Sequence, residues 1–142
     1  MEYLTKEDVQ SCLPDAISII DDLFRMYKEY FESSHRSDKN YTSLHIYFRT
    51  FTLLKVWGIT EEDCISLLVR KNQLYSMTPI LITKHYGIAV RCLDKLSRLK
   101  NMINLENDCP VDNLNESIRD TIMDLHNYSI LNLILEKNKC VD

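Results

Sequence analysis

The sequence predicts an all-α protein, and three observations lead to this fold class. Only 2 of the 142 residues are Gly and only 3 are Pro, which leaves too few turn residues for a many-stranded sheet. Apolar residues recur every three or four positions over long stretches, the period of an amphipathic helix. Hydrophobic residues make up 45% and charged residues 27% of the chain, as in globular domains. We expect one domain, a helical bundle of about five helices, in which two long C-terminal helices form an antiparallel hairpin.

The first half of the chain predicts two helices separated by a polar loop. Pro14 marks the start of the first helix, whose apolar spacing continues to Phe31. Residues 33–40, SSHRSDKN, interrupt this spacing and predict the loop. The second helix ends at Gly58, a residue type that helix C-termini favour. Its expected apolar face consists of Leu44, Tyr47, Phe48, Phe51, Leu54 and Trp57.

Two further helix starts follow in the middle of the chain. Thr60 and Asp63 resemble a capping box, with Asp in place of Glu, and predict a helix over residues 61–75. Thr78 is expected to be an N-cap, with Pro79 at the first helical position.

The helix that starts at Pro79 is expected to be long, and a last helix follows it. It should run to about Ile103, with Gly87 as its only weak point. After the loop NLENDCPVDN, Asn113 and Glu116 form another cap signature, and the last helix should continue to about Lys137.

Charge and cysteine content narrow the function classes. A net charge of −4 and an isoelectric point near 5.6 argue against a general nucleic-acid binder, which needs a basic surface. No signal pattern and no run of roughly 18 apolar residues is present, so we expect a cytoplasmic protein without a membrane span, in the host cytoplasm if it is viral. The five cysteines form no CxxC pair, which favours reduced thiols.

Three carboxylates stand four residues apart in the predicted last helix, at Glu116, Asp120 and Asp124. Like charges at this spacing repel on an exposed helix, at a cost of about 0.2–0.5 kcal/mol per pair. We therefore expect a cation opposite them.

The preceding helix offers basic side chains on one face, with a carboxylate among them. Arg91, Lys95 and Arg98 gather there together with Asp94, and Lys84 projects the same way one or two turns earlier. If the two helices pack antiparallel, the basic and acidic faces meet in one cleft.

Two explanations of this arrangement stay open. The basic side chains neutralise the carboxylates in a structural ion-pair network. Alternatively, carboxylates hold Mg²⁺ through hard oxygen ligands while the basic side chains bind substrate phosphates. The metal ligands would then be Asp94, Glu116, Asp120 and Asp124, and the phosphate-binding residues Arg91, Lys95, Arg98 and Lys84.

Three other residues are weighed in the same way. Tyr75 and Tyr128 are candidates for contacts to a base or ribose, although a tyrosine at a core edge is a common structural feature. His126 has no serine or cysteine nucleophile pattern near it, so we expect a surface or interface histidine.

Two ordered motifs carry a resemblance to a known family. HYGIAVRCLDKLSRLKNMI followed by NESIRDTIMDLHNYSILNLI resembles the phage nucleotide-modification-associated domain, whose members carry a VR..DK..RL helix and then an NES..DT..D..NY helix. The resemblance covers residues 70–135, close to half the chain, and residues 1–67 resemble nothing known. In outline the family is similar to the all-α MazG-like and dimeric dUTPase nucleotide pyrophosphatases, which bind Mg²⁺ with acidic residues on helices.

The resemblance implies a set of site residues and one departure. It implicates Arg91, Asp94, Lys95, Arg98, Glu116, Asp120, Asp124, Asn127 and Tyr128. The family usually has a KN.DYGP.N-like segment, which reads KNQLYSMTP here. Leu74 replaces the acid, Ser76 the Gly and Pro79 the Asn. If that acid is needed for chemistry, this protein binds a nucleotide without cleaving it.

Three functions follow as expectations. The first is a Mg²⁺-dependent nucleotide pyrophosphohydrolase. The second is a non-catalytic binder that sequesters a nucleotide, for example a cyclic-nucleotide signal of a host defence. The third is a structural or regulatory bundle that meets a protein partner through its first half. A nucleotide or other phosphorylated small molecule is the expected partner, and the apolar face from Leu44 to Trp57 favours a homo-oligomer.

Overall fold

The computed structural model describes residues 6–32, 40–74, 76–105 and 112–139, and these residues form five helices and no strand. The helices are α1 (Lys6–Glu32), α2 (Asn40–Val56), α3 (Glu61–Leu74), α4 (Thr78–Leu105) and α5 (Asp112–Lys139). For this part of the chain the predicted all-α class is confirmed. None of the described helices combines the length and the apolar character that crossing a membrane requires.

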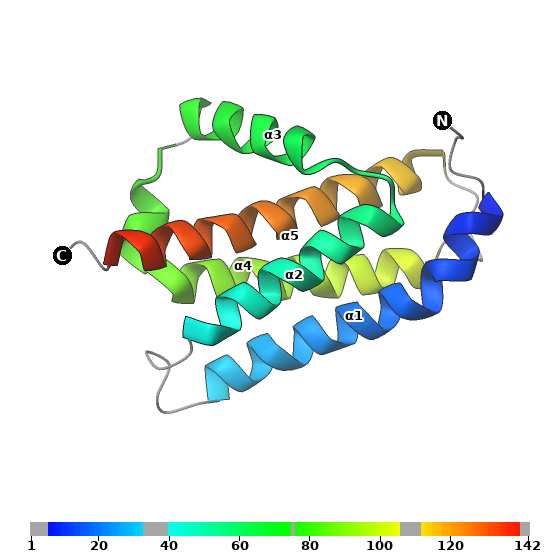
Figure 1. Ribbon diagram of the computed structural model, residues 1–142, viewed down its shortest axis with the longest axis horizontal. Helices are drawn as coiled ribbons and strands as arrows, with labels where there is room; N and C mark the ends of the chain where they lie inside the picture. The colour runs from blue at the N-terminus through cyan, green and yellow to red at the C-terminus, as the bar shows by residue number, and fades with distance from the viewer. Residues whose placement is uncertain (1–5, 33–39, 75, 106–111, 140–142) are drawn as a thin grey trace.

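Four helices form a bundle, and α3 lies outside it along α5 (Figure 1). The hairpin of α4 and α5 is antiparallel, as predicted, because contacts that advance along α4 move backward along α5. His85 bonds to Asn132, and Lys95 pairs with Asp124. In the same way α1 runs antiparallel to α4, since Asp21 pairs with Lys100, whereas Phe31, further along α1, contacts Tyr86, which lies earlier in α4.

The core lies between these four helices. Its fully buried aliphatic side chains come from all of them: Ile20, Leu23, Leu53, Leu54, Ile88, Leu96, Leu99, Ile118, Ile122 and Leu125. Each buried side chain of this size contributes about 1.5–3 kcal/mol, so the bundle needs no contribution from α3 to have a core. That leaves α3 available to form the wall of a site.

The end of α2 matches the prediction in detail. Gly58 has φ 65°, a left-handed conformation that glycine adopts without steric cost. Its N–H donates to the Lys55 carbonyl and the Ile59 N–H donates to the Leu54 carbonyl, which is the Schellman arrangement. Arg119 of α5 also donates to the Trp57 carbonyl at 2.7 Å. The chain therefore leaves α2 in a fixed direction toward α3.

One of the two predicted caps in the middle of the chain is confirmed and one is displaced. The Asp63 N–H donates to the Thr60 hydroxyl at 3.2 Å, as the capping box predicted. For α4 the capping side chain is Ser76 rather than Thr78, because Ser76 Oγ accepts the N–H of Thr78 at 3.0 Å. Pro79 therefore lies further inside the first turn than expected.

The predicted start of α1 at Pro14 is wrong. The helix begins at Lys6 and continues through the proline. Proline lacks the N–H for one helical hydrogen bond, but its φ is compatible with a helix. The predicted Asn113 cap of α5 involves a side chain outside the described residues.

The predicted apolar face of α2 is only partly correct. Leu54 and Trp57 are buried, whereas Leu44 and Phe48 are 48% and 57% exposed. The buried face instead includes two polar side chains, Ser43 and Thr50. The prediction from helical periodicity treats core positions as apolar. In the interface with α5, however, the buried Thr50 forms hydrogen bonds with polar side chains of that helix.

A sharp kink divides α4 near its start. Lys84 has φ 55° and ψ −141°, the only non-glycine residue with positive φ in the described chain. A Cβ at Gly87 would lie 1.9 Å from Thr83 Oγ1, so the bend brings Thr83 against a position that only glycine fits. The weak point expected at Gly87 is thus real, but the backbone deviates three residues earlier.

Candidate functional site

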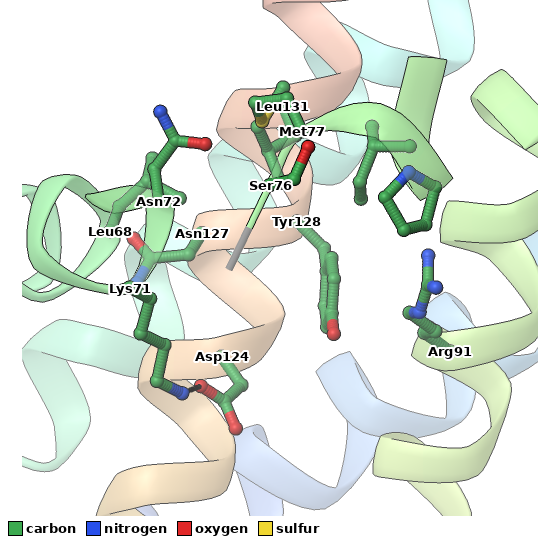
Figure 2. A pocket seen from close by; sticks show the side chains of 12 residues that line it. Leu68, Lys71, Asn72, Ser76, Met77, Arg91, Asp124, Asn127, Tyr128 and Leu131 are labelled. Atoms are coloured by element: carbon green, nitrogen blue, oxygen red, sulfur yellow. Dashed lines mark hydrogen bonds and ion pairs between the residues drawn. The ribbon is translucent and has the colours of Figure 1, made fainter. Parts of the chain in front are cut away.

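A cavity of about 400 Å³ lies between α3, the first turns of α4 and the middle of α5 (Figure 2). This volume falls in the range of small-molecule sites. Its lining residues are Leu68, Lys71, Asn72, Ser76, Met77, Pro79, Ile80, Arg91, Asp124, Asn127, Tyr128 and Leu131. The wall thus combines apolar side chains with a small number of charged and amide groups.

Asp124 sits between two lysines from different helices. Its Oδ1 lies 2.9 Å from Lys71 Nζ of α3, and its Oδ2 lies 3.1 Å from Lys95 Nζ of α4. The Asp124 side chain is 17% exposed, so these pairs are less screened than surface pairs. For this carboxylate the cation expected opposite the acidic row is therefore provided by lysines.

Two other polar side chains of the wall, Arg91 and Asn127, have buried atoms without a hydrogen-bond partner among the described residues. Among the described residues, five buried side-chain nitrogen or oxygen atoms have no hydrogen-bond partner, and three of these belong to the cavity lining. They are Nη1 of Arg91 and both amide atoms of Asn127, a residue only 5% exposed. A buried polar group without a partner costs about 1–3 kcal/mol, so these groups are held at a cost to stability.

Tyr128 lies between these two side chains, with Asn127 on the α3 side and Arg91 on the α4 side (Figure 2). Burial raises the pKa of Tyr128, and the nearby Arg91 charge opposes this effect only in part. The phenol is therefore neutral at physiological pH and presents a flat, uncharged ring to the cavity.

The structure brings part of the predicted site together. Arg91, Asp124, Asn127 and Tyr128 all line the cavity. Lys95 does not line the cavity, but it contacts the lining residue Asp124 through an ion pair. The remaining described candidates are exposed and lie outside the lining: Lys84, Asp94, Arg98, Glu116 and Asp120. Tyr75 lies outside the described residues.

The four predicted magnesium ligands do not gather around one point. Asp124 alone is in the cavity wall, while Asp94, Glu116 and Asp120 are exposed. Over the described residues, no group of three or more His, Cys, Asp or Glu side chains is placed to hold a metal ion. Residues four positions apart on a helix are offset by about 40°, so Glu116, Asp120 and Asp124 point in progressively different directions from α5. The residues present do not fit Mg²⁺, which stays a sequence prediction.

Sequence reasoning missed the contribution of α3 and of the α3–α4 corner. Lys71, Asn72 and Ser76 all line the cavity, and none was among the predicted site residues. The signal was present in the segment KNQLYSMTP, which the resemblance aligned with a family motif. Lys71 and Asn72 are the first two residues of this segment.

A second polar cluster joins three helices; it is buried at His126 and Thr50 and partly exposed at Glu61. His126 of α5 places Nε2 2.7 Å from Glu61 of α3 and Nδ1 2.9 Å from the Thr50 hydroxyl of α2. Tyr47 also donates to Glu61, and Ser129 donates to the His126 carbonyl at 2.6 Å. His126 is fully buried, so the expectation of a surface or interface histidine is wrong.

The protons in this cluster can be assigned from the pKa shifts. Burial by itself raises the pKa of Glu61, but the hydrogen bonds from Tyr47 and His126 outweigh it and lower the pKa overall. Burial lowers the pKa of His126, and Glu61 offsets this only in part. Glu61 is therefore ionised and accepts from Nε2–H, which leaves Nδ1 of the neutral imidazole as an acceptor. The one proton of the Thr50 hydroxyl is shared between this nitrogen at 2.9 Å and the Tyr47 carbonyl at 3.0 Å.

The order hydroxyl, imidazole and carboxylate resembles a catalytic triad, but its position makes it structural. Thr50 and Ser129 are almost completely buried and do not line the cavity, so no substrate reaches either hydroxyl. The cluster instead fixes Glu61, the first residue of α3, against the bundle. His126 stands four residues after the buried Ile122, and this spacing could have predicted its burial.

Comparison of the chain with protein-family models, with curated proteins and with solved structures gives no match. The resemblance to the phage nucleotide-modification-associated domain therefore remains a sequence prediction, and the function is argued from the cavity.

Proposed function

We propose that the protein binds a nucleotide, or a phosphorylated molecule built like one, in the cavity between α3, α4 and α5. The observation that carries this proposal is that Arg91 Nη1 and both amide atoms of Asn127 are buried at the cavity without partners. A guanidinium selects an anion, and a side-chain amide selects a neighbouring donor and acceptor such as the edge of a base. A nucleotide carries both groups on one molecule.

The rest of the wall supports the same ligand class. Lys71 is a second cation at the rim, 46% exposed and able to reach a phosphate. Leu68, Met77 and Leu131 provide an apolar surface, and the neutral ring of Tyr128 is suited to stacking on a base. A purely structural ion-pair network accounts for Asp124 with its lysines, but not for unpartnered groups at a cavity.

Binding without hydrolysis is the better supported form of this function. Asp124 favours the pyrophosphohydrolase alternative, since it is a carboxylate in the cavity wall. However, two lysines already pair with it, and the other three predicted metal ligands lie outside the lining. We therefore propose a binder that holds its nucleotide intact, as sequestration requires.

The test is recovery of a bound small molecule from the native protein. Mass spectrometry of the heat-released fraction should give a phosphorylated, base-containing compound, and calorimetry with a nucleotide panel in EDTA should show binding of an unaltered ligand. No binding of any panel member, together with no co-purified phosphorylated compound, would exclude the proposal. Recovery of cleaved products in Mg²⁺ would favour hydrolysis instead.

A further inference from the structure

We propose that the corner between α3 and α4, residues 68–74 and 76–83, is a lid over the cavity, hinged at Lys84 and latched by the Lys71–Asp124 ion pair. The identity of the guest beneath it rests on the proposed function, but the motion itself does not. This segment is called the corner lid below.

The corner lid forms most of the cavity wall. It supplies seven of the twelve lining residues: Leu68, Lys71, Asn72, Ser76, Met77, Pro79 and Ile80. The other five come from the bundle helices, at Arg91, Asp124, Asn127, Tyr128 and Leu131. The cavity therefore lies between the corner lid on one side and the bundle helices α4 and α5 on the other.

The hinge is built into α4. Lys84 adopts φ 55° and ψ −141°, a region costly for a side chain with a Cβ, and it separates the first turns of α4 from the long remainder. Thr83, on the lid side, rests against Gly87, where a Cβ would clash. Residues at such positions absorb the backbone rotation in hinged closures. In Figure 1 the start of α4 is turned away from the rest of the helix at this point.

Attachment of the segment weakens along α3 from its start to its end. Glu61 is held by His126 and Tyr47, and Cys64 is completely buried. Leu74, at the other end, is 74% exposed, and Ile82 on the α4 side is 75% exposed. Segments with few buried contacts belong to the part of a fold that opens first. The start of α3 is therefore an anchor, and the corner beyond it is the moving part.

The buried position of the ligand-binding atoms gives a reason for opening. Arg91 Nη1 and the Asn127 amide are shielded in this structure, although they are the groups that a guest must meet. Moving the corner lid outward uncovers them from the side of Asn72 and Met77. The motion withdraws Ile80, Leu68 and Met77 from the edge of the core, while the completely buried side chains between α1, α2, α4 and α5 stay in place.

Among the described residues, the latch is the one ion pair that joins the corner lid to the bundle. Lys71 binds Asp124 from α3, whereas Lys95 binds the same carboxylate from α4, which belongs to the bundle. An anionic guest competes with Asp124 for Lys71 and leaves Lys95 in place, so Asp124 keeps one partner when the latch opens. The two lysines therefore form a matched pair for experiment.

Lid motion is measured by the distance between spin labels at Val69→Cys on the corner lid and Asn101→Cys on α4, both exposed. Cys12, Cys109 and Cys140 are replaced by Ser, and the buried Cys64 and Cys92 are kept. A label pair at Lys28→Cys and Lys137→Cys reports on the bundle alone. The protein is examined without nucleotide, so the result does not depend on the proposed function.

Lys71→Met should increase the population with the longer lid distance by roughly two- to fivefold, the change that loss of one partly exposed ion pair gives. Lys95→Met removes the other ion pair of Asp124 and should leave the distribution unchanged, and the bundle pair should be unaffected in both. One narrow lid distance, identical in the wild type and in Lys71→Met, would overturn the lid. Equal shifts in Lys71→Met and Lys95→Met would overturn the latch and hinge.

Discussion

Nε2 of the fully buried His126 lies 2.7 Å from Oε2 of Glu61, and this contact ties the first residue of α3 to the centre of the bundle. On the next two positions of α5, Asn127 and Tyr128 face the cavity. The same short stretch of α5 therefore holds the start of α3 through His126 and forms part of the cavity wall through Asn127 and Tyr128. Substitution of His126 should therefore show how much this contact with α3 contributes to the stability of the protein.

Acidification should destabilise the protein through His126. Its pKa in the folded state lies below the ordinary 6.5, so the unfolded chain takes up a proton first as the pH falls. The stability contributed by the neutral imidazole is complete above about pH 6.5 and is lost below it. Urea unfolding of the wild type and of His126→Asn between about pH 8 and pH 5, the region in which histidine titrates, provides the measurement.

The variant should lose less stability than the wild type over this interval, because it lacks the titrating group. Parallel pH profiles for the two proteins would contradict the assignment of a neutral buried imidazole. Glu61, whose pKa is also lowered, adds a second loss below about 4.5.

Arg91→Met should weaken nucleotide binding and stabilise the empty protein. It removes a buried nitrogen without a partner, so the free energy of unfolding should rise by about 1 kcal/mol. Affinity should fall about 10- to 100-fold, the loss of a charge-assisted hydrogen bond. Arg98→Met is the control, seven residues further along α4, exposed and outside the lining. Similar effects of the two variants on affinity would argue against the cavity as the site.

Asn127→Leu and Asn132→Leu should change stability in opposite directions. The amide of Asn127 has no partner, so replacing it should stabilise the protein by about 1 kcal/mol while removing selectivity among bases. Asn132 Oδ1 accepts from His85 Nδ1–H at 2.9 Å, so replacing Asn132 leaves a partly buried ring nitrogen without its partner and should cost about 1–3 kcal/mol. Denaturant titration checks both, and destabilisation by Asn127→Leu would indicate a structural amide.

Thr50→Val should destabilise the protein by about 1–3 kcal/mol. It keeps the shape of the side chain but leaves Nδ1 of the buried His126 without its hydroxyl partner at 2.9 Å. Thr50→Ser restores the hydroxyl and should recover most of the loss. The exposed Thr52, whose hydroxyl donates to the Phe48 carbonyl within its own helix, gives the control Thr52→Val, with an expected change within about 0.5 kcal/mol.

Two substitutions at the kink of α4 should change the stability of the protein in opposite directions: Lys84→Gly should raise it and Gly87→Ala should lower it. Lys84→Gly relieves a positive φ and should stabilise the fold by about 1 kcal/mol, after the extra chain entropy of glycine is counted. Gly87→Ala places a Cβ against Thr83 and should destabilise it by about 1–3 kcal/mol. Thermal unfolding distinguishes these outcomes, and a neutral Gly87→Ala would mean that Thr83 moves away freely.

The sequence by itself determined the helical class, the antiparallel hairpin of α4 and α5, and the glycine end of α2, because these depend on local spacing and on residue conformations. It also identified Arg91, Asp124, Asn127 and Tyr128, which line one cavity. Helical periodicity grouped Asp124 with Asn127 and placed Arg91 on the basic face of the preceding helix, whereas Tyr128 was proposed from its residue type and from the family resemblance.

Only the tertiary structure decided which charges meet. Periodicity placed Glu116, Asp120 and Asp124 in one row. Within the described part of the chain, however, Asp124 is the member of this row that pairs with lysines, and one of them comes from α3, 53 residues away in the sequence. The burial of Thr50 and His126, the kink at Lys84 and the side chains that α3 brings to the cavity likewise depend on packing between distant segments. A single helix pattern shows which side chains point the same way, but the neighbour that faces them is set by the fold.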